Sequence, residues 1–225
     1  EEDGNFSSQD YILFYAEGTD TWSAENRTHL NLYQEKSYYY VTSSLGTGKR
    51  IQESIQPTGT PTLNFAVFDD YKFYEKDLFN PGKIGRKWLG DQFGVDNEKT
   101  FEFSIPNIVT SSPVKLYANL ASASYGNSNF QVQVNQQTVG NVSFTSLANV
   151  DFVSAVENFI ETTFNTSSPN IAVKLTYSNG GVPASRGYVD YIILEAKRNL
   201  TGYGNQFIFR NLEEESNIGI GQYTI

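Results

Sequence analysis

The chain has 225 residues, enough for one sizeable domain or for one domain and part of another. It contains no cysteine, which excludes disulfides, thiolate nucleophiles and Cys-ligated metals. Its formal net charge of −9 argues against a nucleic-acid partner, because phosphates would be repelled rather than neutralised. No apolar run approaches the ~20 residues that a membrane-spanning helix needs.

The first ten residues, EEDGNFSSQD, are acidic and lack the apolar core of a signal peptide. The chain has no initiator Met and no Met elsewhere. We therefore expect it to be an excised fragment or a processed chain.

The first 62 residues are expected to form an N-terminal β segment and a connecting loop. The 15 Tyr and 16 Phe of the whole chain stand among many Asn, Ser, Thr and Gly residues, which favours strands joined by polar turns. Residues 10–16 and 37–42 are short β-rich runs, and residues 43–62 are rich in Ser, Gly, Thr and Pro.

Regular alternation begins at residue 63 and predicts a β-sandwich over 63–200. Each predicted strand has an apolar face and a polar face, as a two-sheet sandwich requires. The predicted inward residues include Phe101, Phe103 and Ile105, then Phe130, Val132 and Val134, and finally Ile171, Val173, Leu175 and Tyr177. A turn is expected at residues 135–137.

Residues 151–164, DFVSAVENFIETTF, fit two structures. Phe152, Val156, Phe159 and Ile160 match an amphipathic helix. The Val, Phe and Thr content and the flanking strands favour a strand, which is our interpretation.

The last segment, residues 201–225, is expected to hold a final strand at QFIFR, 206–210, followed by a connector towards a domain that is not present. Together these patterns predict an all-β, antiparallel, jelly-roll-like β-sandwich, with part of a preceding β module at its N-terminus.

A catalytic site is not expected. His29 is the single histidine, and neither a Cys partner nor a GxSxG elbow accompanies it. No cofactor motif occurs either, and calcium is the one ion considered. Asp69, Asp70, Glu75 and Asp77 could offer it oxygen ligands from one loop, although solvated turn carboxylates are the favoured interpretation.

Two tryptophans, Trp22 and Trp88, are candidates for a sugar-binding surface, because such surfaces use flat rings with polar edges. Structural packing is the favoured interpretation for both.

Asp190 lies within the apolar run GYVDYIILEAKRNL, 187–200. Alternation groups it with Tyr188, Ile192 and Leu194 on one face of a buried strand. A buried carboxylate needs partners, and Arg186 or the backbone N–H groups of a nearby loop would serve. We favour a structural role, in which Asp190 pins a loop to the closing strand, over a role as a ligand group.

Several stretches, in this order, resemble the β-rich region that precedes the peptidase domain in PorU-type sortases of the type IX secretion system, which are gingipain-related C25 cysteine peptidases. They are DYILFYAEGTDTW (10–22), NLYQEKSYYYVT (31–42), GKRI (48–51), GRKWLGDQF (85–93), RGYVDYI (186–192) and LTGYGNQFIFR (200–210).

This resemblance implies an exported parent, at the cell surface or associated with the outer membrane, that removes C-terminal sorting signals and attaches cargo to lipopolysaccharide. It implies that the catalytic His and Cys belong to a peptidase domain after residue 225, and no catalytic residue carries over to this chain. The expected partners are that peptidase domain, type IX secretion components and cargo.

Two alternatives remain. The strand around Asp190 is similar to V-D-Y-I-x-L at the end of jelly-roll carbohydrate-binding modules, which would show an exposed aromatic platform beside a polar groove. A cell-surface adhesin domain has the same composition.

Overall fold

The computed structural model describes residues 7–9, 11–20, 30–31, 33–42, 44–46, 48, 52–53, 55–83, 87–147, 154–204, 208–211 and 219–225. The strands are β1 (Leu63–Phe65), β2 (Val67–Glu75), β3 (Gln92–Phe93), β4 (Glu98–Ser104), β5 (Val114–Ala123), β6 (Ser128–Val134), β7 (Gln137–Phe144), β8 (Val156–Phe164), β9 (Asn170–Ser178), β10 (Arg186–Asn199) and β11 (Gly221–Tyr223). Within these ranges the structure has no helix. The described residues accordingly provide no long apolar helix of the kind that crosses a membrane.

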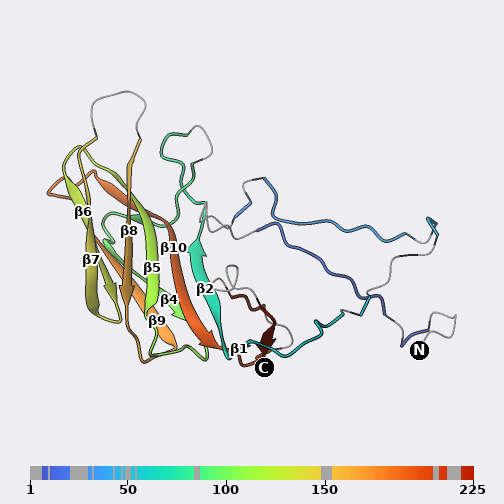
Figure 1. Ribbon diagram of the computed structural model, residues 1–225. Helices are drawn as coiled ribbons and strands as arrows, with labels where there is room; N and C mark the ends of the chain where they lie inside the picture. The colour runs from blue at the N-terminus through green and yellow to red at the C-terminus, as the bar shows by residue number, and fades with distance from the viewer. Residues whose placement is uncertain are drawn as a thin grey trace. The chain divides into compact units, whose positions relative to one another are not determined.

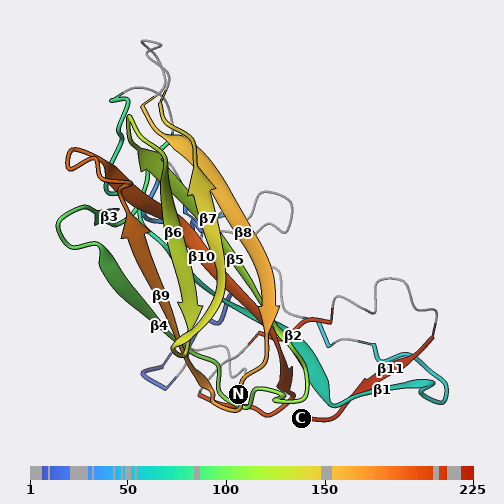
Figure 2. The ribbon, with the colours of Figure 1, turned by 90° about the vertical axis from the view of Figure 1, so that its left-hand side faces the viewer.

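Two antiparallel sheets form a sandwich (Figure 1). One has the order β2-β10-β5-β8, with β3 also paired to β10, and the other has the order β4-β9-β6-β7. In Figure 2 the sheet of β4, β9, β6 and β7 lies in front of β5 and β10. The predicted all-β, antiparallel sandwich is therefore confirmed.

The core lies between the two sheets and is built from the inward residues that alternation predicts. Phe101, Phe103 and Ile105 are buried, as are the alternating residues of β6 and β9. Phe130 contacts three other rings: its centroid lies 4.9 Å from those of Phe93 and Tyr177 and 6.1 Å from that of Phe144. Each inward row faces the opposite sheet, which is why a period of two in the sequence predicts it.

The turn expected at 135–137 is a two-residue turn between β6 and β7. Asn135 and Gln136 have φ values of 47° and 72°, and Gln137 already belongs to β7. Positive φ at both central residues matches the twist of the flanking strands. Asn135 Oδ1 also accepts a hydrogen bond from Ala172 N at 2.9 Å, which joins the turn to β9.

The described part of 151–164 is a strand, so the preference for strand over helix is confirmed. β8 covers residues 156–164 and pairs with β5 over its whole length. Residues 151–153 lie outside the described residues. This segment forms a strand rather than a helix because, as β8, it gains a full ladder of backbone hydrogen bonds from an existing sheet edge.

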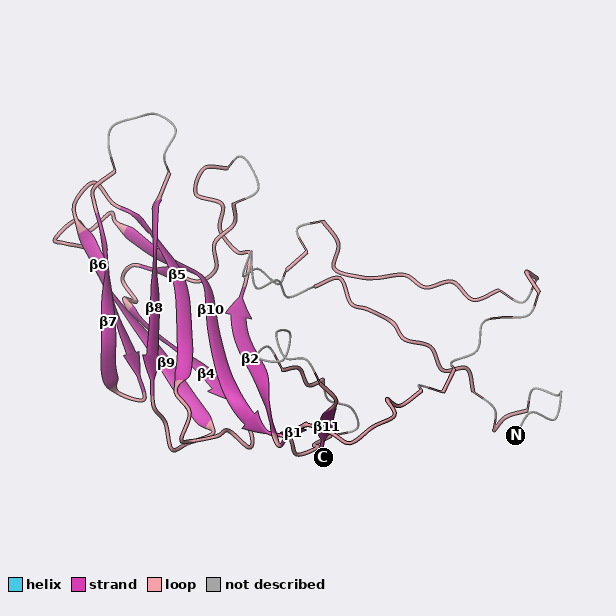
Figure 3. Cartoon of the chain, viewed as in Figure 1, coloured by secondary structure: helices cyan, strands magenta, loops and turns pink. Residues whose placement is uncertain are grey.

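Residues 1–53 form a unit separate from residues 54–225. The strands expected at 10–16 and 37–42 are wrong for this chain, because the described residues of both runs belong to no strand (Figure 3). A strand needs a neighbouring edge, and an isolated pair of strands is marginal in water. The predicted division into 1–62, 63–200 and 201–225 stays a prediction.

The strand expected at 206–210 is also wrong for the residues that the structure describes. Residues 208–210 belong to no strand, and Arg210 O accepts a backbone bond from Asp69 N at 2.8 Å. The last strand is β11, which pairs in parallel with β1. The rings of Phe65 and Tyr223 lie 4.9 Å apart across this pair, and the ring of Phe209 lies 5.3 Å from that of Tyr223.

Candidate functional site

Asp190 occupies a β-bulge in the longest strand of the sandwich. Val189 pairs with Leu120 of β5 and Tyr191 pairs with Asn119, so Asp190 is the extra residue between them. A bulge shifts the side-chain alternation by one residue and redirects the side chain at that point.

The bulge overturns the predicted grouping of Asp190 with Ile192 and Leu194. Val189, Ile192 and Leu194 belong to the core between the sheets, whereas Tyr188 packs with Leu89 in a smaller cluster. Strict alternation failed here because the extra residue exchanges the two faces.

The Asp190 carboxylate is nevertheless buried, with the residue 7% exposed. Its Oδ2 accepts hydrogen bonds from Lys87 Nζ at 2.6 Å and from Asn119 Nδ2 at 2.9 Å. Lys87 Nζ also lies 3.1 Å from Glu157 Oε2. Arg186, an expected partner, instead donates to the backbone oxygens of residues 183 and 185.

The pKa values of this cluster follow from unequal burial. Burial raises the pKa of Asp190, and it outweighs the opposing hydrogen bond and charge of Lys87 and the hydrogen bond from Asn119. Burial alone would lower the pKa of Lys87, but the attraction of Asp190 and Glu157 exceeds it and raises that pKa. Burial affects the two pKa values differently because the Lys87 side chain is half exposed and keeps much of its hydration, whereas the Asp190 side chain is buried.

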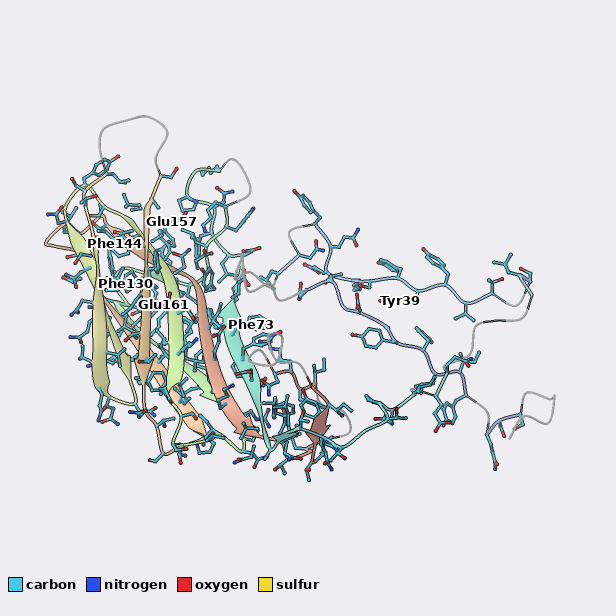
Figure 4. The ribbon with its side chains drawn as sticks, in the orientation of Figure 1. Tyr39, Phe73, Phe130, Phe144, Glu157 and Glu161 are labelled. Carbon is cyan, nitrogen blue, oxygen red and sulfur yellow. The ribbon has the colours of Figure 1, made fainter. Side chains whose placement is uncertain are left out.

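Lys87 reaches Asp190 because the chain after it lies along β10. Gly90 N donates to Val189 O at 2.7 Å, and Val189 N donates to Asp91 O at 3.1 Å. A Cβ on Gly90 would lie 2.9 Å from Val189 O and 3.1 Å from Lys76 O, so only glycine fits this close approach. The cluster of Asp190, Lys87, Asn119 and Glu157 thus holds this segment to the sheet. Glu157 is labelled on β8 in Figure 4.

The four carboxylates considered for calcium are not brought together. Asp69 and Asp70 lie within β2 rather than in a loop, and Glu75 ends that strand. At ~3.3 Å per residue, Asp69 and Glu75 are roughly 20 Å apart along it. The described residues contain no group of three or more metal-ligating side chains.

Each of the first two carboxylates instead has a basic partner. Asp69 Oδ1 lies 2.8 Å from Lys197 Nζ, and Asp70 Oδ2 accepts a hydrogen bond from Arg198 Nη1 at 2.8 Å. Burial, followed by the negative charge of Glu75, raises the pKa of Asp77.

Arg198 is a buried residue that the sequence reasoning missed. It is 2% exposed, and its Nε donates to Pro106 O at 2.6 Å. Its guanidinium carbon lies 5.1 Å from the ring centroid of Phe68 and 4.8 Å from that of Tyr203. Counting in twos from Leu194 leads to an inward Arg198, so uninterrupted alternation after Leu194 already predicts its face.

A groove of about 680 Å³ lies beside β2, and Tyr71, Phe73, Tyr203, Arg198 and Arg210 are among the residues that line it. The rings of Tyr71 and Phe73 are stacked within it, with centroids 6.3 Å apart and planes inclined by 23°. Aromatic and charged side chains therefore share one concave surface.

Of the two tryptophans considered for a sugar-binding surface, the structure describes Trp88. Trp88 is partly exposed next to Lys87. Trp22 and His29 lie outside the described residues.

No family model matches the sequence, and no curated protein matches it either. Among solved structures, dimeric latent PorU from Porphyromonas gingivalis aligns with 75% of this chain at 16% identity and a TM-score of 0.62. The aligned region spans 16% of the PorU chain.

A CBM36-1 domain of a multidomain xylanase, from the hindgut metagenome of Trinervitermes trinervoides, aligns with 60% of this chain at 12% identity. The alignment covers 99% of that domain, with a TM-score of 0.38. The chain is thus similar in fold to a β-rich region of PorU.

Proposed function

We propose that the chain is a non-catalytic β-sandwich region of a PorU-like type IX secretion sortase. In this role it scaffolds the peptidase domain of the same parent chain or contacts cargo and secretion components. The observation that carries the proposal is the fold likeness to PorU over 75% of the chain, taken with the order of the sequence stretches that resemble that family.

The chemistry of the chain supports a scaffolding role. C25 catalysis requires a thiolate, and the chain has no cysteine. The buried charged groups Asp190 and Arg198 are bonded to other parts of the sandwich. Such groups position segments of the fold, as a scaffold needs.

By the same resemblance, we propose that the parent is exported and acts at the cell surface or outer membrane on C-terminal sorting signals. Its peptidase domain would follow Ile225, and reading the encoded sequence beyond that residue is the first test. A stop codon there, or a domain without His and Cys, would refute the proposal.

A functional test uses the full-length parent with one of two neighbouring substitutions in β9. Val173→Asp places a carboxylate in the core, where Val173 is fully buried, and Ala172→Asp places one beside it on the outward row. We expect Val173→Asp to abolish removal of sorting signals from cargo, and Ala172→Asp to leave it near the wild-type rate. Normal processing with an unfolded sandwich would contradict the scaffolding role.

A second candidate function, glycan binding, is favoured by the groove beside β2. Phe73 offers a partly exposed ring stacked beside Tyr71, whose ring centroid lies 4.5 Å from the Arg210 guanidinium carbon. The buried Nη2 of Arg198 has no hydrogen-bond partner among the described residues. The test is calorimetric titration of the chain with a panel of soluble oligosaccharides, comparing wild type with Tyr71→Ala and the loop control Tyr125→Ala. Saturable binding weakened at least tenfold by Tyr71→Ala alone would support it, and absence of saturable binding would reject it.

A further inference from the structure

Two extended runs in the N-terminal unit, residues 11–18 and 36–42, carry apolar side chains that the structure leaves in solvent. We call these two runs the ribbon. Exposed side chains follow one another from Tyr11 to Tyr15 and again from Tyr38 to Val41. Tyr11 is 82% exposed and Tyr40 is 91% exposed. Runs of this kind mark interaction surfaces, because a soluble protein otherwise keeps such patches small.

The apolar residues would occupy both faces of a strand. Alternation places Tyr11, Leu13 and Tyr15 on one side of the first run and Ile12 and Phe14 on the other. Continuous apolar runs of this length are typical of strands that are covered on both faces, whereas a strand at a solvated surface alternates with polar residues.

The two runs already lie beside each other. The hydroxyl of Tyr39 is 2.6 Å from Glu17 N and 2.7 Å from Glu17 O, and the rings of Phe14 and Tyr39 lie 5.9 Å apart. Further along, Asn31 N donates to Asp20 Oδ1 at 2.9 Å. Figure 4 labels Tyr39 between the two runs. The ribbon thus has the course of a hairpin, but its described residues belong to no strand.

A hairpin with two apolar faces is completed by a sheet that offers an open edge and apolar cover on each side. We propose that the ribbon adds as two strands to the sheet of another β-module in the same polypeptide. This inference rests on the proposed function, because it requires a parent longer than 225 residues. In the likeness to PorU, the aligned region spans only 16% of the PorU chain, so a parent of that kind has room for such a module.

Charge argues against a second copy as the occupant. Residues 1–53 carry nine acidic and four basic side chains, and residues 54–225 carry sixteen acidic and twelve basic ones. Ribbons from two copies would therefore bring together units of the same sign. A module in the same polypeptide also meets the ribbon at a high effective concentration, which limits the time that its apolar side chains spend in water.

The first experiment is hydrogen exchange with mass spectrometry on the 225-residue chain and on the full-length parent. We expect amides of the ribbon to exchange at least 100-fold more slowly in the parent, because they gain strand partners there. Amides of β9, paired on both sides within the sandwich, serve as an internal reference and should exchange slowly in both. Equally fast exchange of the ribbon in both proteins would overturn the proposal.

The second experiment identifies the occupant in the parent, with p-benzoylphenylalanine placed at Tyr40 for photo-cross-linking. Cross-links to a β-strand outside residues 1–225 of the same polypeptide are expected. Cross-links to residues 54–225, to a second copy or to a different protein would overturn the proposal, as would their absence. The same label at exposed Tyr125, in the loop between β5 and β6, should not reach that strand.

The two proposals fail separately. Ribbon amides that stay unprotected, while removal of sorting signals depends on the sandwich, would overturn only the ribbon inference. Ribbon amides protected by another β-module, in a parent without a peptidase domain, would overturn only the proposed function.

Discussion

Replacing the buried carboxylate of Asp190 tests whether it holds the segment that carries Lys87 to the bulge of β10. We expect Asp190→Asn to destabilise the fold while any binding activity stays proportional to the folded fraction. The amide oxygen still accepts from Asn119, but the negative charge opposite Lys87 is lost. Asp190→Ala removes both hydrogen bonds and should cost more.

The magnitude follows from the two hydrogen bonds to Asp190 Oδ2, from Lys87 Nζ at 2.6 Å and Asn119 Nδ2 at 2.9 Å. Each bond to a charged group contributes about 1.5–3 kcal/mol. Burial of the charge opposes these bonds and raises the pKa of Asp190, so the loss on substitution comes from the donors left without their partner rather than from the charge itself. The Lys87 ammonium keeps Glu157 as a partner. The expected loss in unfolding free energy is therefore about 1–2 kcal/mol for Asp190→Asn and about 2–3 kcal/mol for Asp190→Ala.

Urea unfolding and thermal melts of both variants provide the measurement, and a loss of 1 kcal/mol lowers Tm by about 2–4 °C in a chain of this size. Glu102→Gln, an exposed carboxylate of β4, is the matched control and should stay within about 0.5 kcal/mol of wild type. Melts with and without glycans, and with calcium or a chelator, show whether a ligand contributes.

An unshifted midpoint for Asp190→Asn, with loss of binding to sugar or calcium, would refute the structural role and identify Asp190 as a ligand group. Equal losses for the Asn and Ala variants would contradict the assignment of a retained bond to Asn119.

Because the pKa of Asp190 is raised on folding, the folded state holds its proton longer, so its contribution to stability should fall as pH rises from the ordinary value near 3.9 through the raised one. Over that range the slope of unfolding free energy against pH should therefore be more negative in wild type than in Asp190→Asn, and equal slopes would contradict the raised pKa. The isolated chain should not cleave peptides that carry a sorting signal, and turnover that survives removal of contaminants would disprove this. Arg198→Ala should cost about 3–5 kcal/mol in urea unfolding, because it leaves Asp70 without its closest partner, and a loss under 1 kcal/mol would contradict that role.

The strands of the sandwich could be predicted where the inward and outward residues alternate without interruption. β6 and β9 are such strands, and their apolar rows are buried as expected. In both, the polar residues between the apolar ones exclude the alternative of a helix. The same reasoning could not assign partners to 10–16 and 37–42, because strand formation needs a neighbouring edge that a local pattern does not describe.

The candidate site was predicted only in part. A carboxylate within an apolar run predicts that Asp190 needs hydrogen-bond partners. The sequence does not identify those partners, because they are distant in the chain. Lys87 is 103 residues away and Asn119 is 71 residues away. Local reasoning instead suggested Arg186, the nearest basic side chain.

The sequence by itself determined that the chain is all-β and which residues form most of the core, because a period of two is a property of each segment alone. The tertiary structure decided where that period breaks. The bulge at Asp190 depends on how β10 pairs with β5, and it reverses the face on which Asp190 lies. The pairing of β10 with β2 sets Arg198 opposite Phe68 and brings its guanidinium to Asp70. Strands far apart in the chain pair through backbone hydrogen bonds, which every sequence can make. The register of such a pair is therefore fixed only when the apolar faces pack in the folded sheets.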